Sequence, residues 1–231
     1  MIIEAIDVTK VYDTRGVETR ALDGVTFGLE KGEFTALAGP SGSGKTTLLN
    51  LLGALDTPSS GKIQLDGVEL SELSPSALSE LRLRKLGFVF QAYNLIPVLT
   101  ARENVEFVME LQGVPSKERR ERADQVLTRV GLSGLEDKRP LEMSGGQQQR
   151  VAVARAIASR PSIVLADEPT ANLDSETASR LLELMGQLNR EDGVTFLFST
   201  HDPLVMDAAR RVVRLHDGRI SNDEVKDQVE A

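Results

Sequence analysis

The stretch that decides the fold is Gly39-Pro40-Ser41-Gly42-Ser43-Gly44-Lys45-Thr46, which matches the pattern G-x-x-x-x-G-K-[ST]. A loop of this kind wraps phosphate with its backbone N–H groups, and its glycines remove the Cβ atoms that would obstruct the approach. In this pattern the lysine reaches the terminal phosphates, and the hydroxyl that follows it is a ligand for Mg²⁺. The loop therefore predicts a site for a nucleoside triphosphate.

The residues on either side of the loop agree with this prediction. Residues 34–38 (FTALA) form a short, mostly apolar run, which indicates a buried strand. Residues 47–55 are rich in leucine and indicate an apolar helix. The order strand, glycine loop, helix is the context that a phosphate-binding loop requires, and it makes a merely flexible glycine turn the weaker interpretation.

Composition narrows the class of protein. The chain has 231 residues, 40% hydrophobic and 27% charged, as expected of one globular domain with subdomains. Its net charge of −8 disfavours nucleic acid as the main partner, and the absence of cysteine excludes disulfides and thiolate sites. We expect no signal peptide and no membrane span, because no apolar run approaches the required ~20 residues.

Alternating strands and helices predict an α/β fold with a mostly parallel sheet. A helical insertion interrupts the pattern near residues 92–143, where Ser116 is predicted to cap a helix. A second helix is predicted from Ser144 to about Ser159, opened by a capping box between Ser144 and Gln147. Strands are expected at residues 2–8, 20–30, 34–38, 62–67, 86–91, 162–166 and 194–199, and a closing hairpin with its turn at Asp217-Gly218 is expected at 212–220.

Two further motifs indicate chemistry. Asp167 and Glu168 follow the buried strand 162–166, at the strand end where α/β sheets present ligand groups. Asp167 suits a metal shell and Glu168 suits the activation of a water molecule, although a solvent-facing acidic pair has the same pattern. Gly145 and Gly146 leave bare N–H groups at a helix start, which indicates a second anion site. The alternative is an ordinary glycine-rich helix start.

Taken in order, these motifs resemble the nucleotide-binding subunit of ATP-binding cassette (ABC) transporters. Met143-Ser144-Gly145-Gly146-Gln147 is similar to the family signature Leu-Ser-Gly-Gly-Gln, with methionine in place of leucine. Tyr12 stands at the place of the residue that stacks on adenine, and Gln91 at that of the glutamine that senses Mg²⁺ and the attacking water. Ala171-Asn172-Leu173-Asp174 resembles the loop that crosses the dimer interface, and His201 the histidine that contacts the γ-phosphate.

The resemblance implies the ABC ATPase fold over residues 1–231. It is a phosphate-loop NTPase core with an antiparallel β subdomain (about 1–91 and 144–222) and an α-helical subdomain (about 92–143). It also implies ATP and Mg²⁺ as cofactors. The implied catalytic residues are Glu168, His201 and Gln91, and the implied metal ligands are Thr46, Gln91 and Asp167. The implied nucleotide-binding residues are Tyr12, Gly39, Pro40, Ser41, Gly42, Ser43, Gly44, Lys45, Thr46, Thr47, Ser144, Gly145, Gly146, Gln147 and Asp174.

Further segments, among them Leu52-Gly53-Ala54-Leu55-Asp56-Thr57-Pro58, are similar to the branch that contains the lipoprotein-releasing and macrolide-exporting ATPases. This branch implies ATP-driven pairing of two copies, integral membrane permease subunits as partners, and a place on the cytoplasmic face of the cell (inner) membrane. We expect the apolar segment 93–99, next to Gln91, to contact the permease.

Other classes remain to be weighed. Within the branch, a cell-division or other mechanotransmission role is the main alternative to transport. A soluble ABC ATPase acting on nucleic acid is disfavoured, because the chain is acidic and has neither a long coiled-coil insertion nor a second cassette. A phosphate-loop kinase or GTPase would have no use for the segment 144–147, and the guanine-reading pattern Asn-Lys-x-Asp is missing from the sequence.

Overall fold

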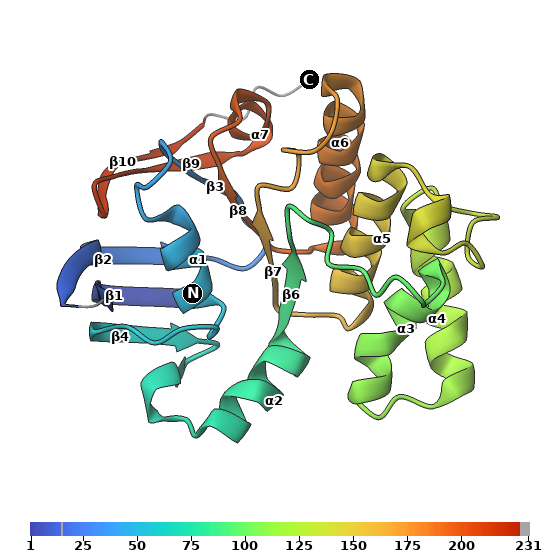
Figure 1. Cartoon of the computed structure of the whole chain (residues 1–231), viewed down its shortest axis with the longest axis horizontal. Coiled ribbons are helices and arrows are strands. Elements are labelled where there is room, and N and C mark those ends of the chain that lie inside the picture. Colours follow the sequence, from blue (N-terminus) through green and yellow to red (C-terminus); the bar gives the residue numbers. More distant parts are fainter. Residues whose placement is uncertain (15, 227–231) are drawn as a thin grey trace.

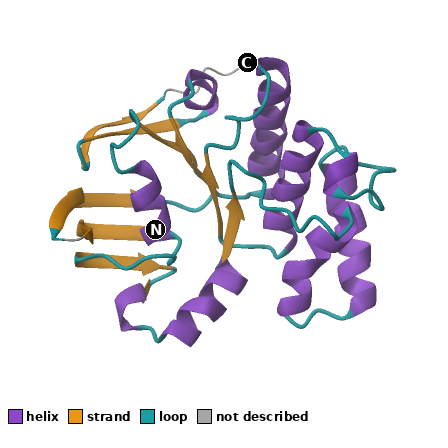
Figure 2. Ribbon diagram, in the orientation of Figure 1, coloured by secondary structure: helices purple, strands orange, loops and turns teal. Residues whose placement is uncertain are grey.

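A six-stranded sheet lies at the centre of the computed structural model, which describes residues 1–14 and 16–226 (Figures 1 and 2). Its strand order is β10-β9-β3-β8-β7-β6, and all neighbours are parallel except the edge hairpin of β9 and β10. The strands are β3 (Phe34–Ala38), β6 (Leu86–Val89), β7 (Ile163–Asp167), β8 (Phe196–Thr200), β9 (Arg211–His216) and β10 (Arg219–Val225).

A second, antiparallel sheet has the order β2-β1-β4-β5. Its strands are β1 (Ile3–Thr14), β2 (Val17–Leu29), β4 (Ser60–Leu65) and β5 (Val68–Glu69). β1 extends well past residue 8, where the sequence analysis ended it, because shifts of register between Ala5 and Val8 absorb the break in alternation. Asp7 takes a left-handed φ of 49° at this irregularity.

Helices flank the central sheet, and α3, α4 and α5 lie on the side opposite the antiparallel sheet (Figure 1). The helices are α1 (Lys45–Leu52), α2 (Pro75–Lys85), α3 (Ala101–Leu111), α4 (Ser116–Arg129), α5 (Gly145–Ala158), α6 (Ser175–Asp192) and α7 (Pro203–Ala208), with short 3-10 turns at Leu70–Glu72 and Pro140–Glu142. None of the described helices is both long enough and apolar enough to cross a bilayer.

Successive side chains of the parallel strands point to opposite faces of the sheet, so the core has two parts. Leu37 and Leu165 face the antiparallel sheet and α1, whereas Ala36 and Val164 face α6. Both sides are therefore buried, which is why these strands read as continuous apolar runs. A third cluster joins α3, α4 and α5 through residues such as Val105, Leu127 and Val151.

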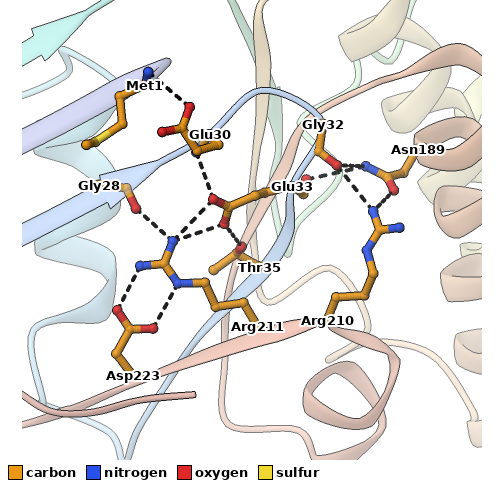
Figure 3. Close-up of polar contacts among 10 residues, drawn as sticks. All are labelled: Met1, Gly28, Glu30, Gly32, Glu33, Thr35, Asn189, Arg210, Arg211 and Asp223. Carbon is orange, nitrogen blue, oxygen red and sulfur yellow. Dashed lines mark hydrogen bonds and ion pairs between the residues drawn. The ribbon is translucent and has the colours of Figure 1, made fainter. Parts of the chain in front are cut away.

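An ionic network fastens the sheet edge where β2, β3 and β9 meet (Figure 3). Arg211 pairs with Asp223 at 2.7 Å and with Glu33 at 3.0 Å. Its guanidinium also donates to the Gly28 carbonyl at 2.8 Å, and its hydrogen bonds to the Asp223 carboxylate raise the pKa of Arg211 above its ordinary value. This edge lies at the amino ends of the parallel strands, so the network braces the fold away from the phosphate loop.

Of the two predicted helix caps, one is confirmed and one is wrong. The capping box at Ser144 is confirmed, with the Gln147 N–H donating to Ser144 Oγ and the Gln147 side chain accepting from the Ser144 N–H. The predicted cap at Ser116 is wrong: Pro115 occupies the N-cap position, and Ser116 is already helical. A proline suits that position because its φ is fixed near −65° and it has no N–H to satisfy.

Candidate nucleotide site at the carboxyl ends of the parallel strands

The phosphate loop joins β3 to α1, and its lysine folds back into it. Lys45 Nζ donates to the carbonyls of Gly39 at 2.8 Å and Pro40 at 3.0 Å, and the side chain is buried. Gly44 has a φ of 101°, and a Cβ there would lie 2.6 Å from the Ala21 carbonyl oxygen. The N-terminus of α1 has no side-chain cap, so its N–H groups face the loop without an internal acceptor. This arrangement is suited to an anion.

Thr46 and Asp167 meet although they are far apart in the sequence. The Thr46 hydroxyl donates to Asp167 Oδ1 at 3.3 Å, from the first turn of α1 to the end of β7. Hydroxyl and carboxylate oxygens are the kind of ligand that coordinates Mg²⁺. The described residues contain no group of three or more acidic or histidine side chains suited to a metal. The pair therefore fits an ion that takes its other ligands from phosphate and water.

Glu168 and His201 form the next pair along the sheet edge. His201 Nδ1 lies 2.7 Å from Glu168 Oε1, and Thr200 Oγ1 donates to Glu168 Oε2 at 3.3 Å. Glu168 has a left-handed φ of 44°, held by its N–H bond to the Ser199 carbonyl. A non-glycine residue in this conformation carries strain, which clusters at functional sites. The carboxylate is thus fixed by β8, and the far nitrogen of the exposed imidazole remains for a ligand.

Gln91 lies two residues past the end of β6, on an exposed turn. Its described contact is through the backbone, where its carbonyl accepts from Asn172 Nδ2 at 2.9 Å. Val89 pairs with Ala166, so Gln91 follows the strand next to the one that carries Asp167. The bond to Asn172 links the segment after β6 with the segment 171–174, a connection that sequence reasoning did not anticipate.

The glycines at the start of α5 are needed for close packing. A Cβ on Gly145 would lie 2.8 Å from Tyr93 Oη, and one on Gly146 would lie 2.5 Å from Thr177 Cγ2. Sequence reasoning explained these glycines by their bare N–H groups, and the packing adds a second reason. Asp174 caps α6 by accepting from the Thr177 N–H at 2.9 Å, a bond that lowers the pKa of Asp174.

The structure thus divides the predicted site residues into groups. One group lies at one edge of the central sheet and consists of Lys45, Thr46, Asp167, Glu168 and His201. The other group lies at the starts of two helices: residues 144–147 begin α5, and Asp174 is the N-cap of α6. Among the described residues no hydrogen bond joins the segment 144–147 to the phosphate loop.

Tyr12 lies on the outer half of β1 and is partly exposed. Its hydroxyl donates to Asp56 at 2.9 Å, and burial together with this carboxylate raises the pKa of Tyr12. Sequence reasoning named Tyr12 but gave no role to Asp56 or to Lys10, which also binds Asp56. The available signal was the motif 52–58, in which Asp56 stands next to a turn.

The segment 93–99 is only partly free. Val98 is exposed, but Leu95 packs against the cluster of α3, α4 and α5, and Tyr93 lies against Gly145. The contact with a permease expected of this segment would therefore fall to its exposed residues, because Leu95 is partly buried against the helices. A groove of about 410 Å³ lies beside the segment instead, lined by residues that include Phe88, Ile96 and Phe107.

Comparison with known proteins supplies the context. The family model described as ABC transporter matches residues 22–171. The chain is 50% identical over 206 residues to a lipoprotein-releasing system ATP-binding protein, LolD 1, of Rhodopseudomonas palustris, covering 89% of this chain and 91% of that protein. It is 48% identical over 221 residues to a macrolide export ATP-binding/permease protein, MacB, of Syntrophobacter fumaroxidans, covering 95% of this chain but 31% of that protein. The chain thus spans about a third of that longer relative.

A solved structure is similar over nearly the whole chain. The dimeric structure of a post-hydrolysis state of the ATP-binding cassette MJ0796, bound to ADP and Pi, matches with a TM-score of 0.90 at 41% identity. The match covers 98% of this chain and 99% of that one.

Proposed function

The chain belongs to the ABC transporter family, and on that premise we propose how its residues bind ATP, hydrolyse it and pass the resulting movement to a membrane permease. The chain is an ATPase subunit of the branch that includes LolD and MacB. The observation that carries the proposal is the convergence of Lys45, Thr46, Asp167, Glu168 and His201 at the carboxyl ends of the parallel strands.

ATP would lie with its phosphates in the loop 39–46. The N–H groups of the loop and of α1 bind phosphate oxygens, and Lys45 turns from the carbonyls of Gly39 and Pro40 to the terminal phosphates. Thr46 and Asp167 would hold Mg²⁺ together with Gln91, and this ion supplies neutralisation of phosphate charge when bound. The adenine base would stack on Tyr12.

Hydrolysis would depend on the pair of Glu168 and His201. Glu168 is held by His201 and Thr200, so its carboxylate can orient a water molecule and accept its proton. His201 would steady that carboxylate through Nδ1 and contact the terminal phosphate through its other nitrogen. The local backbone strain at Glu168 is consistent with a carboxylate held in place for this purpose.

A second copy of the chain would complete each site. The start of α5 presents N–H groups at a helix N-terminus, and among the described residues no hydrogen bond joins residues 144–147 to the phosphate loop of their own chain. Ser144, Gly145 and Gly146 of one protomer would therefore bind the terminal phosphate held by its partner, with Asp174 at the interface. The dimeric solved relative supports this arrangement.

The permease would dock in the groove of about 410 Å³ between β6, α3 and α5. Its wall is mostly apolar, and the partly exposed Phe107 belongs to it; Val98 is exposed on the segment 93–99, two residues after Ile96 in the wall. A helix of the permease suits such a groove. The MacB relative carries an ATP-binding part and a permease in one protein, and this chain matches a third of it. Docking would hold the subunit at the cytoplasmic face of the cell membrane.

Substitution of Lys45 tests the nucleotide site. Lys45→Ala should weaken ATP binding by about 10- to 100-fold, as expected for loss of a charge-assisted hydrogen bond, and should abolish turnover at cellular ATP. Equilibrium binding, turnover and circular dichroism should be measured together. Lys62→Ala, which removes an exposed lysine paired with Glu69, is the matched control and should bind ATP normally. Normal ATPase activity in a folded Lys45→Ala protein would refute the proposed site.

A further inference from the structure

Tyr12 is held in place by a carboxylate 44 positions later in the chain. Its hydroxyl donates to Asp56 Oδ2 at 2.9 Å, while 37% of the residue remains exposed. The ring is therefore neither a core side chain nor a free one. A fixed and partly exposed aromatic ring provides a surface on which a base can stack.

Lys10, on the same strand as Tyr12, also bonds to Asp56. Its ammonium donates to Asp56 Oδ1 and to the Thr57 carbonyl, both at 2.7 Å. The same nitrogen lies 4.8 Å from the centroid of the Tyr12 ring, a cation–π distance. Lys10 is 9% exposed, so this cation is largely removed from water. Asp56 thus accepts from both residues and fixes the position of each.

Asp56 belongs to the segment that continues directly from α1. The N–H groups of Leu55 and Asp56 bond to the carbonyl of Asn50, which lies within that helix. Lys45 is the first residue of the same helix. The carboxylate that fixes Tyr12 is therefore attached to the helix that begins at the phosphate loop.

We propose that Asp56 is a positioning residue for the nucleotide base: it holds the Tyr12 ring, with the help of Lys10, at a fixed separation from the phosphate loop. The inference rests on the proposed binding of ATP, whose base and phosphates would contact the two elements that Asp56 joins. Without Asp56 the Tyr12 ring loses the hydrogen bond that ties it to the segment after α1, although the backbone of β1 stays attached there through Lys10 and Val11. Stacking then has to order the ring at the moment of binding, which weakens binding.

The competing explanation is purely structural. The Lys10–Asp56 ion pair also braces the antiparallel sheet against α1, and a brace alone affects the whole site. Its loss would lower the melting temperature and weaken phosphate binding as much as base binding. A ligand that has phosphates but no base separates the two explanations.

The experiment compares ATP with inorganic tripolyphosphate, each with Mg²⁺, by titration calorimetry. Asp56→Ala should weaken ATP binding by about tenfold, as expected for loss of one base-stacking contact, and should leave tripolyphosphate binding unchanged. KM for ATP should rise by a similar factor while kcat changes less than about twofold. The matched control is Asp124→Ala, which removes a carboxylate of α4 that pairs with Arg102 of α3; it should change neither affinity.

Two variants of Tyr12 keep the test decisive if Asp56→Ala folds poorly. Tyr12→Phe removes only the hydroxyl and should weaken ATP binding by about threefold, as expected for one hydrogen bond. Tyr12→Ala should weaken it as much as Asp56→Ala does, and the double variant should lose no more than either single variant.

Each contrary result has a distinct meaning. Equal losses for ATP and tripolyphosphate in Asp56→Ala would overturn the inference in favour of the brace. Normal ATP affinity in Asp56→Ala, with reduced affinity in Tyr12→Ala, would overturn the inference and leave the proposed function standing. Normal ATP affinity in Tyr12→Ala would overturn both the inference and the proposed place of the base.

Discussion

Two consecutive carboxylates at the end of β7 have different surroundings at the residue scale, and the difference assigns their roles. Asp167 meets the Thr46 hydroxyl at 3.3 Å, whereas Glu168 meets His201 at 2.7 Å. The contact with Thr46 places the Asp167 carboxylate beside the phosphate loop, whereas Glu168, with its left-handed φ, places its carboxylate beside Thr200 and His201. In the proposed mechanism Asp167 would therefore help to hold a metal ion, and Glu168 would orient a water molecule.

The two histidines of the chain offer a controlled test of this division. His201→Ala should lower kcat by about 10²-fold, because Glu168 loses the partner that orients it, while KM for ATP changes little. His216 is equally exposed and pairs with Asp217 at 3.2 Å, at the last residue of β9. His216→Ala should leave both parameters unchanged. Steady-state kinetics on the two variants decide the point, and equal losses would exclude a specific role for His201.

At the scale of elements, the segment after β6 is attached to the helices. Arg155 on α5 donates to the carbonyls of Tyr93 and Asn94, and the buried Asn104 on α3 bonds to the backbone of Ile96 and Leu99. These two side chains attach the segment 93–99 to α3 and α5, and Tyr93 lies two residues after Gln91. A permease helix in the groove would act on the nucleotide site by this route.

Two exposed apolar side chains, Val98 and Phe107, test the groove. Val98→Ser, combined with Phe107→Ser, should reduce co-purification with the permease subunits and the stimulation of ATPase activity by them, because it removes apolar contact area. Basal ATPase activity should stay within about twofold, since the catalytic groups lie on other segments. Val225→Ser is the matched control, because Val98 and Val225 are each 72% exposed. A similar loss of co-purification in Val225→Ser would contradict a specific role for the groove.

Sequence patterns predicted the elements whose burial is strong. The strand 34–38 was predicted with its observed bounds because both of its faces are covered. Helix α2 was missed, since none of its residues is buried and it has no apolar stripe to detect. The loop motifs located Lys45 and Glu168, but the bonds from Tyr12 to Asp56 and from Asn172 to Gln91 join distant segments and arise only from the fold.

At the scale of the whole molecule, the account requires two chains. One edge of the central sheet carries the phosphate loop and the pair of Glu168 and His201, whereas Ser144 begins a helix in another part of the chain. In the proposed arrangement each site would therefore be completed by the second protomer. Charge on the terminal phosphate would hold the two chains together, and hydrolysis would release them.

The most direct test of this claim is the association state of Glu168→Gln with ATP, measured by light scattering. The substitution should keep ATP binding and slow hydrolysis by about 10²–10⁴-fold, the usual contribution of a positioned base. With saturating ATP and Mg²⁺ the variant should be a dimer, with ADP a monomer, and with ATP plus the added substitution Ser144→Arg a monomer again. A Glu168→Gln protein that stays monomeric with saturating ATP, or that hydrolyses ATP at the original rate, would contradict the account.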